Sequence, residues 1–194
     1  MSSSDAVAAI LLSGGSSRRF GRDKTQLEID GMTLAVRTAA MLLMVVDTAI
    51  EAGPGVSGLP AVIDDHPGEG PLGGVVAAVR ALRRDGHVGA ALVVACDLPF
   101  LSSSLLRFLV EFDATGSVVP IVAGRAQPLC ARWGAGDLDR AHHMFASGER
   151  SLRYLTEQTG VDLVDESRWG AFATSKDFLD VDSPDDARRL GIAL

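Results

Sequence analysis

Short apolar runs alternate with segments of helical periodicity along the chain. Uninterrupted apolar runs cover 6–12 and 88–96, a pattern that is typical of strands buried on both faces of a parallel sheet. Shorter strands are expected at 47–51, 60–64, 117–122, 127–133 and 161–164. Helical patterns cover 33–46, 75–84, 105–112, 135–147 and 151–159. The alternation of strands and helices predicts a three-layer α/β fold around a mostly parallel sheet.

The same pattern fits a single domain. We expect residues 1–4 to form a disordered tail and residues 5–194 to form one domain, because no linker, internal repeat or low-complexity segment interrupts them. Of the 194 residues 47% are apolar, which is enough for a substantial core. Near the end of the chain Ser183 is expected to cap a last helix that has Pro184 at its first position.

Charge and cysteine content exclude several classes of protein. The formal net charge of −7 argues against a nucleic-acid or membrane-surface binder, since both partners require a positive field. The two cysteines are far apart and have no CxxC spacing, so neither a zinc site nor a disulfide framework is expected. The apolar run at 6–12 is too short for a signal or membrane-spanning segment. We therefore expect a cytoplasmic protein that binds neither nucleic acid nor membranes.

A glycine-rich and basic loop follows the first expected strand. It begins with Gly14 and Gly15 and then carries Arg19 and Lys24 in an otherwise acidic chain. Backbone N–H groups in such a loop can bind phosphate, and the positive charge suits a triphosphate. The spacing matches neither the P-loop nor the dinucleotide fingerprint. The alternative for this stretch is a surface turn whose arginines lie in water.

Two acidic stretches are candidates for a metal site. Asp97 follows the apolar run at 88–96, and a carboxylate there is costly unless it is paired or binds a cation. Hard oxygen ligands combined with substrate phosphates favour Mg²⁺. In FLDVDSPDD, alternation along an expected strand places Asp180 and Asp182 on one face. Asp182 is the candidate for a second magnesium ligand, and a solvated strand end is the alternative.

Three motifs in order along the chain resemble those of one enzyme family. They are LSGG at 12–15 followed by Arg19 and Lys24, then GPLGG at 70–74, then CDLPF at 96–100. Together they resemble the molybdenum cofactor guanylyltransferases over about residues 7–190. The resemblance implies a Rossmann-like nucleotidyltransferase fold and transfer of GMP from GTP, with Mg²⁺, to the phosphate of molybdenum-molybdopterin. It also implies release of pyrophosphate and contacts with molybdoenzyme maturation proteins.

The resemblance and the motifs together suggest a role for each candidate residue. The catalytic group is Arg19, Lys24 and Asp97, and the metal ligands are Asp97 and Asp182. The nucleotide-binding group is Leu12, Ser13, Gly14, Gly15, Lys24, Asp65, Gly70, Pro71, Leu72 and Asp97. For the acceptor phosphate the candidates are Gln127 and Asp180. Gly70–Leu72 precede an expected helix and offer its amino terminus to an anion or base, although a simple turn is the alternative.

The chain departs from the family pattern at positions that bear on the substrates. Ser13 stands where the family usually has alanine, and Glu51 stands where guanylyltransferases tend to carry an asparagine that contacts the nucleotide. Gln127 replaces a histidine, and aspartates replace asparagines at 180 and 182. Alternatives are therefore a CTP-dependent molybdopterin cytidylyltransferase, another nucleotidyltransferase that acts on a phosphate, and a nucleotide-binding assembly factor without turnover. The presence of both Lys24 and Asp97 favours an enzyme.

Overall fold

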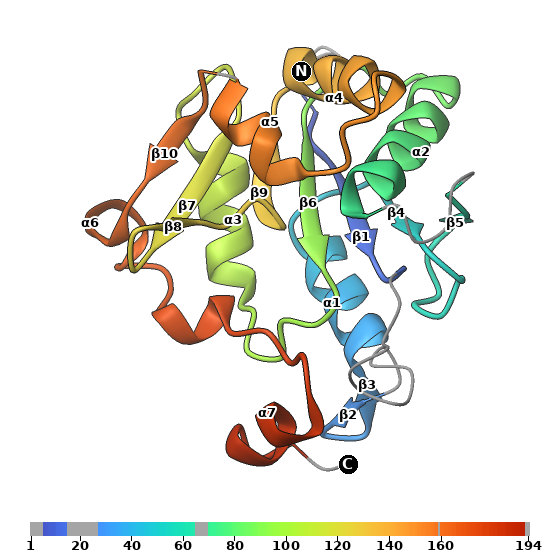
Figure 1. The fold of residues 1–194 in the computed structure, drawn as a ribbon. Coiled ribbons are helices and arrows are strands. Elements are labelled where there is room, and N and C mark those ends of the chain that lie inside the picture. The colour runs from blue at the N-terminus through green and yellow to red at the C-terminus, as the bar shows by residue number, and fades with distance from the viewer. Residues whose placement is uncertain (1–5, 15–26, 65–69, 159, 193–194) are drawn as a thin grey trace.

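The computed structural model describes residues 6–14, 27–64, 70–158 and 160–192 (Figure 1). Its strands are β1 (Ala8–Leu12), β2 (Glu28–Ile29), β3 (Met32–Thr33), β4 (Ala49–Ala52), β5 (Ala61–Val62), β6 (Ala91–Ala95), β7 (Val118–Val122), β8 (Arg125–Ala126), β9 (Cys130–Trp133) and β10 (Asp162–Val164). Its helices are α1 (Leu34–Leu43), α2 (Pro71–Arg84), α3 (Ser103–Glu111), α4 (Ala135–Ala146), α5 (Leu152–Gln158), α6 (Glu166–Trp169), the 3-10 helix η2 (Ser175–Phe178) and α7 (Pro184–Arg189).

The central sheet has the order β10-β7-β9-β6-β1-β4-β5, and β8 pairs with β7. β1 lies between β4 and β6 and is parallel to both. β9 is antiparallel to β6 and β7, so the sheet is mixed but mostly parallel, as the sequence predicts. Leu12 is in register with Ala52 on one side and Ala95 on the other, so three strands end at the same edge of the sheet. This edge faces the bottom of Figure 1.

The two faces of the sheet are covered by different helices, which makes the predicted three layers. On one face Ile10 and Leu12 of β1 pack in a core with residues of α2, α4 and α5. On the other face Ala9 and Leu11 pack with residues of α1, α3 and α6. Alternate side chains of a strand point to opposite faces, so a strand covered on both sides must be apolar throughout. The buried AAILL run of β1 fits this rule, and Figure 1 shows the helices on both sides.

The structure confirms the cap predicted at Ser183 and shows a different start for one other helix. The hydroxyls of Thr33, Ser102 and Ser183 each accept a backbone N–H in the first turn of α1, α3 and α7. The helix predicted over 75–84 is α2, and its predicted start at Val75 is wrong, because α2 begins at Pro71. Proline suits the first position of a helix, where its missing N–H is no loss, and Gly70 takes the cap position with φ +93°.

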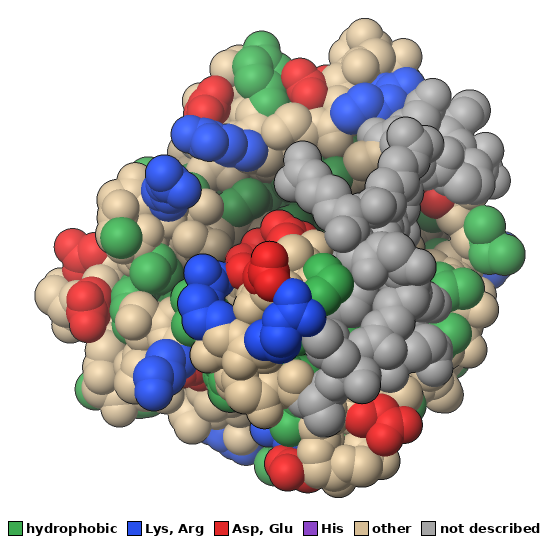
Figure 2. Space-filling model, turned by 60° about the horizontal axis from the view of Figure 1, so that its bottom comes forward, with side chains coloured by type: hydrophobic (Ala, Val, Ile, Leu, Met, Phe, Trp, Pro, Cys, Tyr) green, Lys and Arg blue, Asp and Glu red, His purple; other side chains and the backbone are tan. Residues whose placement is uncertain are grey.

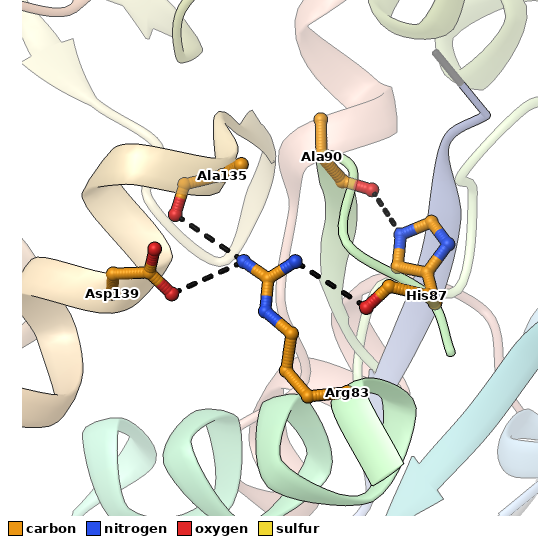
Figure 3. Close-up of polar contacts among 5 residues, drawn as sticks. All are labelled: Arg83, His87, Ala90, Ala135 and Asp139. Atoms are coloured by element: carbon orange, nitrogen blue, oxygen red, sulfur yellow. Dashed lines mark hydrogen bonds and ion pairs between the residues drawn. The ribbon is translucent and has the colours of Figure 1, made fainter. Parts of the chain in front are cut away.

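A polar network ties α2 to α4 on one face of the sheet (Figure 3). The guanidinium of Arg83 donates to Asp139 Oδ1 at 3.1 Å and to the carbonyls of His87 and Ala135 at 3.3 and 3.5 Å. The His87 ring lies 3.0 Å from the carbonyl oxygen of Ala90. Arg83 therefore has a structural role, because it holds α2 and α4 together. None of the helices in the described ranges combines the length and apolar character that crossing a membrane requires.

Candidate functional site

The first and third motifs meet where β1 and β6 end. The N–H of Cys96 donates to the carbonyl of Leu12 at 3.0 Å, which extends the pairing of the two strands by one residue. Asp97 follows directly and is half-buried. In an open parallel sheet ligands bind outside the carboxyl ends of the strands. Asp97 therefore lies where β6 ends, next to the end of β1 from which the glycine loop continues.

The segment before α7 lies against Asp97. The N–H of Val181 donates to the Asp97 carbonyl at 3.0 Å, and the Val181 side chain is fully buried with Leu27 and Leu34. Asp180 and Asp182, on either side of Val181, are exposed. The predicted strand over these residues is wrong, because residues 179–182 form no strand in the described range 160–192. Exposure still alternates along 180–182, because the burial of Val181 alone leaves the aspartates on either side of it exposed.

The start of the glycine loop is fixed by the neighbouring strand. The N–H groups of Ser13 and Gly14 both donate to the carbonyl of Ala52, each at 3.2 Å. The side chains of Leu12 and Ser13 are buried, so their contact with a ligand would be through the backbone, as the resemblance implies. Four of the predicted site residues lie outside the described part of the chain: Gly15, Arg19, Lys24 and Asp65.

The GPLGG stretch forms the cap and first turn of α2. Leu72 is 0% exposed and packs in the core, so only its backbone remains for a ligand, whereas Gly70 and Pro71 are exposed. A Cβ added at Gly73 would lie 2.3 Å from Oδ2 of Asp64. The protein's own carboxylate therefore packs against the first turn of α2. This contact was not predicted, and it explains why a glycine is needed inside the helix.

The turn that carries Gln127 lies beside the end of β6. The N–H of Ala95 donates to the carbonyl of Leu129 at 2.8 Å, which places this turn two residues from Asp97 along β6. The Gln127 side chain donates from Nε2 to the carbonyl of Arg125 at 3.2 Å. The sequence expected one strand from 127 to 133, but β9 begins at Cys130, because 127–129 form the turn after the short β8.

A buried carboxylate on β4 was not predicted as part of the site's framework. Glu51 is 0% exposed and accepts hydrogen bonds from the hydroxyls of Ser13 and Ser57, each at 2.5 Å. Burial by itself would raise the pKa of Glu51, but bonds from these hydroxyls and from the Val56 and Ser57 N–H groups outweigh it. The pKa of Glu51 therefore lies below its ordinary value. The sequence signal that could have indicated this buried carboxylate is a glutamate within a short apolar strand.

The donor set at this edge fits a hard divalent cation. Asp97 and Asp182 offer carboxylate oxygens, and Val181 holds their two chain segments together. Among the residues that the structure describes, no group of three or more His, Cys, Asp or Glu side chains could hold a metal without help. Mg²⁺ is commonly held by one or two carboxylates together with substrate phosphates, so a pair of aspartates is compatible with such a site.

Figure 2 shows the face that carries this edge of the sheet. Asp and Glu side chains gather near its middle, and Lys and Arg side chains stand on either side of them. A separate cavity of about 550 Å³ runs along the outer side of α3, with Phe108, Phe172 and Arg168 in its lining. Its lining includes none of the predicted site residues. The candidate site is therefore the edge where β1, β4 and β6 end.

Comparison with known proteins identifies the family of the chain. Residues 9–163 match the family model described as the MobA-like NTP transferase domain. A Chloroflexus aggregans protein named probable molybdenum cofactor guanylyltransferase is 32% identical over 94% of this chain and 92% of its own length. The molybdenum cofactor guanylyltransferase of Rhodobacter capsulatus is 33% identical over 77% of this chain and 80% of its own.

Solved structures share the fold. The molybdopterin-guanine dinucleotide biosynthesis protein A of Archaeoglobus fulgidus superposes with a TM-score of 0.77 at 22% identity, over 94% of this chain and 96% of that one. The Rv0371c protein of Mycobacterium tuberculosis, solved as a complex with manganese, has a TM-score of 0.66 at 17% identity, over 95% and 97% of the two chains. With most of its length matched by the family model and by relatives above 30% identity, the chain belongs to the MobA-like NTP transferase family.

Proposed function

We propose that this protein is a molybdenum cofactor guanylyltransferase, which transfers GMP from GTP to the phosphate of molybdenum-molybdopterin and releases pyrophosphate. Family membership and the names of the curated relatives support this activity. The observation that carries the proposal is the hydrogen bond from Cys96 to Leu12. It brings the glycine loop and Asp97, which are far apart in the sequence, to the same edge of the sheet.

The chemistry requires little beyond positioning and charge neutralisation. An oxygen of the acceptor phosphate attacks the α-phosphorus of GTP, and a new phosphoanhydride bond forms. The bond from the α-phosphorus to the oxygen that bridges to the β-phosphate breaks, and pyrophosphate leaves with that electron pair. The attacking oxygen is already anionic at neutral pH, so no general base is needed. This fits a site built from glycine amides, basic side chains and carboxylates.

Each part of the site takes one task in this reaction. The backbone at Leu12–Gly15 binds the nucleotide, with Asp65 and the exposed Gly70 and Pro71 beside it. Arg19 and Lys24 neutralise the triphosphate. Gln127 and Asp180 line the acceptor side, which agrees with the position of the Gln127 turn beside the end of β6.

Asp97 and Asp182 would hold Mg²⁺, and when bound this ion neutralises charge on the phosphates. The half-buried position of Asp97 limits its access to water. The Val181 backbone bond keeps Asp182 near it. We also propose that the protein acts in the cytoplasm and that it delivers its product to molybdoenzyme maturation proteins.

The test is a comparison of the four nucleoside triphosphates. The protein is incubated with Mg²⁺, molybdenum-molybdopterin and GTP, CTP, ATP or UTP, and the dinucleotide product is measured by mass spectrometry. The proposal expects the guanine dinucleotide with GTP and at most traces with the others. Product with CTP alone would mean that the protein is a cytidylyltransferase and not a guanylyltransferase. Absence of product with all four would favour the assembly factor.

A further inference from the structure

Glu51 is a charged side chain that the proposed reaction does not use. It is 0% exposed at the end of β4, so its carboxylate cannot contact a ligand. A buried carboxylate is costly unless its oxygens are fully paired. Here five donors meet it, two hydroxyls and three backbone N–H groups. Because an ionised carboxylate only accepts hydrogen bonds, a set made entirely of donors fits the charged form.

The five bonds divide between two segments of the chain. Oε1 accepts from the Ser13 hydroxyl at 2.5 Å and from the N–H groups of Gly55 and Val56 at 2.8 and 3.1 Å. Oε2 accepts from the N–H and the hydroxyl of Ser57 at 2.9 and 2.5 Å. Three successive N–H groups thus form a concave anion site that the protein fills with its own carboxylate. Within the described part of the chain, Ser13 is the donor to Glu51 that comes from outside this loop.

The Ser13 bond joins the loop after β4 to the start of the glycine loop. The contact is close, because a Cβ added at Gly53 would lie 2.0 Å from Ser13 Oγ and 2.8 Å from Gly14 N. The N–H groups of Ser13 and Gly14 also share the carbonyl of Ala52. The Ser13 side chain and the Ser13–Gly14 backbone are therefore both packed closely against the segment that follows β4.

We propose that Glu51 is a positioning residue of the nucleotide site, which acts through the Ser13 hydroxyl to fix the Ser13–Gly14 backbone against the triphosphate. The proposal rests on the proposed function, since it takes that backbone to contact the nucleotide. Glu51 then sets the affinity for the nucleotide and not the rate of the chemical step. A purely structural Glu51 would stabilise the loop after β4 without this selectivity.

The two serines provide a matched pair of variants. Ser13→Ala and Ser57→Ala each remove one hydroxyl that donates to Glu51 at 2.5 Å. In Ser57→Ala the carboxylate keeps the Ser57 N–H and its bond to Ser13, so the glycine loop stays anchored. In Ser13→Ala the loop after β4 stays anchored and the link to the glycine loop is lost.

The experiment measures KM for GTP, kcat and the melting temperature of the full chain. We expect Ser13→Ala to raise KM for GTP about tenfold, which is the effect of one hydrogen bond to a charged group, with kcat within about twofold. Ser57→Ala should lower the melting temperature about as much as Ser13→Ala does. Its KM for GTP should stay near the wild-type value. Glu51→Gln should raise KM at least as much as Ser13→Ala, and if it fails to fold the serine pair still decides.

The outcomes separate this proposal from the proposed function. An active wild-type enzyme in which both serine variants change KM equally, or in which neither changes it, would overturn the positioning role alone. A change confined to kcat in Ser13→Ala would also overturn it. A wild-type protein that transfers no nucleotide would overturn the proposed function, and the positioning role with it.

Discussion

At the scale of single residues, the site separates groups that would touch the substrates from groups that hold them in place. Asp97 directly follows Cys96, whose N–H donates to the carbonyl of Leu12, so Asp97 lies at the edge where β1 and β6 end and is half-buried. Glu51 lies behind the same loop and is fully buried. Both are carboxylates at strand ends, but they differ in burial. Only a carboxylate that can reach the bound nucleotide can hold a cation against its phosphates, so the buried Glu51 can only position other groups.

Replacement of Asp97 by asparagine tests the metal role. The change keeps the shape and removes the charge, so we expect kcat for GMP transfer to fall at least about a hundredfold, since charge stabilisation of this kind contributes several kcal/mol. Steady-state kinetics with varied Mg²⁺ measure it. Asp139→Asn, which weakens the Arg83 contact between α2 and α4, is the control and should keep its activity. Wild-type rates in Asp97→Asn would rule out the assignment.

The pKa of Glu51 predicts a dependence of stability on acid. Because its folded pKa lies below the ordinary value of 4.5, Glu51 stabilises the fold above pH 4.5. That contribution is lost as the pH falls through the folded pKa. Urea unfolding between pH 7 and pH 3 should show that the free-energy difference between wild type and Glu51→Gln shrinks with acidification. A difference that is constant over this range would contradict the hydrogen-bonded carboxylate.

Cys130 is predicted to be unreactive in the folded protein. Burial, with a smaller effect from the negative charge of Asp177, raises the pKa of its thiol from 9.0 to about 12. The thiolate is the reactive form, so at pH 8 a disulfide reagent should leave Cys130 unmodified until the chain unfolds. Cys96 is also buried, and a Cys96→Ala variant isolates the signal of Cys130. Rapid modification of the native variant would show that the thiol is accessible.

At the scale of elements, the first turn of α2 is determined by packing more than by helix propensity. Gly73 and Gly74 lower the propensity of this stretch, which is why the sequence predicts a start at Val75. The structure accepts both glycines because Asp64 packs against Gly73, and Ala52 and Leu12 approach Gly74. The helix therefore begins at Pro71, where it can bring its first turn close to β1 and β4.

The two glycines are expected to respond differently to alanine. In Gly73→Ala the new Cβ would meet Asp64 Oδ2 at 2.3 Å, and displacement of that carboxylate should cost about 1–3 kcal/mol of unfolding free energy. In Gly74→Ala the nearest atoms lie at 3.4 Å, so the gain in helix propensity should offset most of the cost. Urea denaturation measures both. Gly73→Ala combined with Asp64→Ala should recover stability, and an additive loss would contradict the proposed clash.

At the scale of the whole molecule, the sequence predicts the layers and the edge of the sheet that carries the site. The runs that became β1 and β6 are apolar throughout because both faces of the sheet are covered, and this signal is local. The antiparallel direction of β9 could not be predicted, since it depends on the short β8 and the turn at 127–129. The same holds for the Glu51–Ser13 contact, which joins residues 38 apart in the sequence.

The candidate site was predicted in part for the same reason. The position of Asp97 follows from one strand and the sheet rule, so the sequence was sufficient. The anchoring of Asp180 and Asp182 depends on a backbone bond from Val181 to Asp97 and on burial of Val181 against Leu27 and Ala187. These contacts join three distant parts of the chain, and no local pattern encodes them.

The most direct test of nucleotidyl transfer follows the phosphorus atoms of GTP. The protein is given molybdenum-molybdopterin, Mg²⁺ and GTP labelled at either the α- or the γ-phosphate, and the products are separated. Nucleotidyl transfer predicts that the α-label enters the dinucleotide and the γ-label appears in pyrophosphate, in equal amounts. Release of the γ-label as inorganic phosphate, with no label in a dinucleotide, would contradict nucleotidyl transfer.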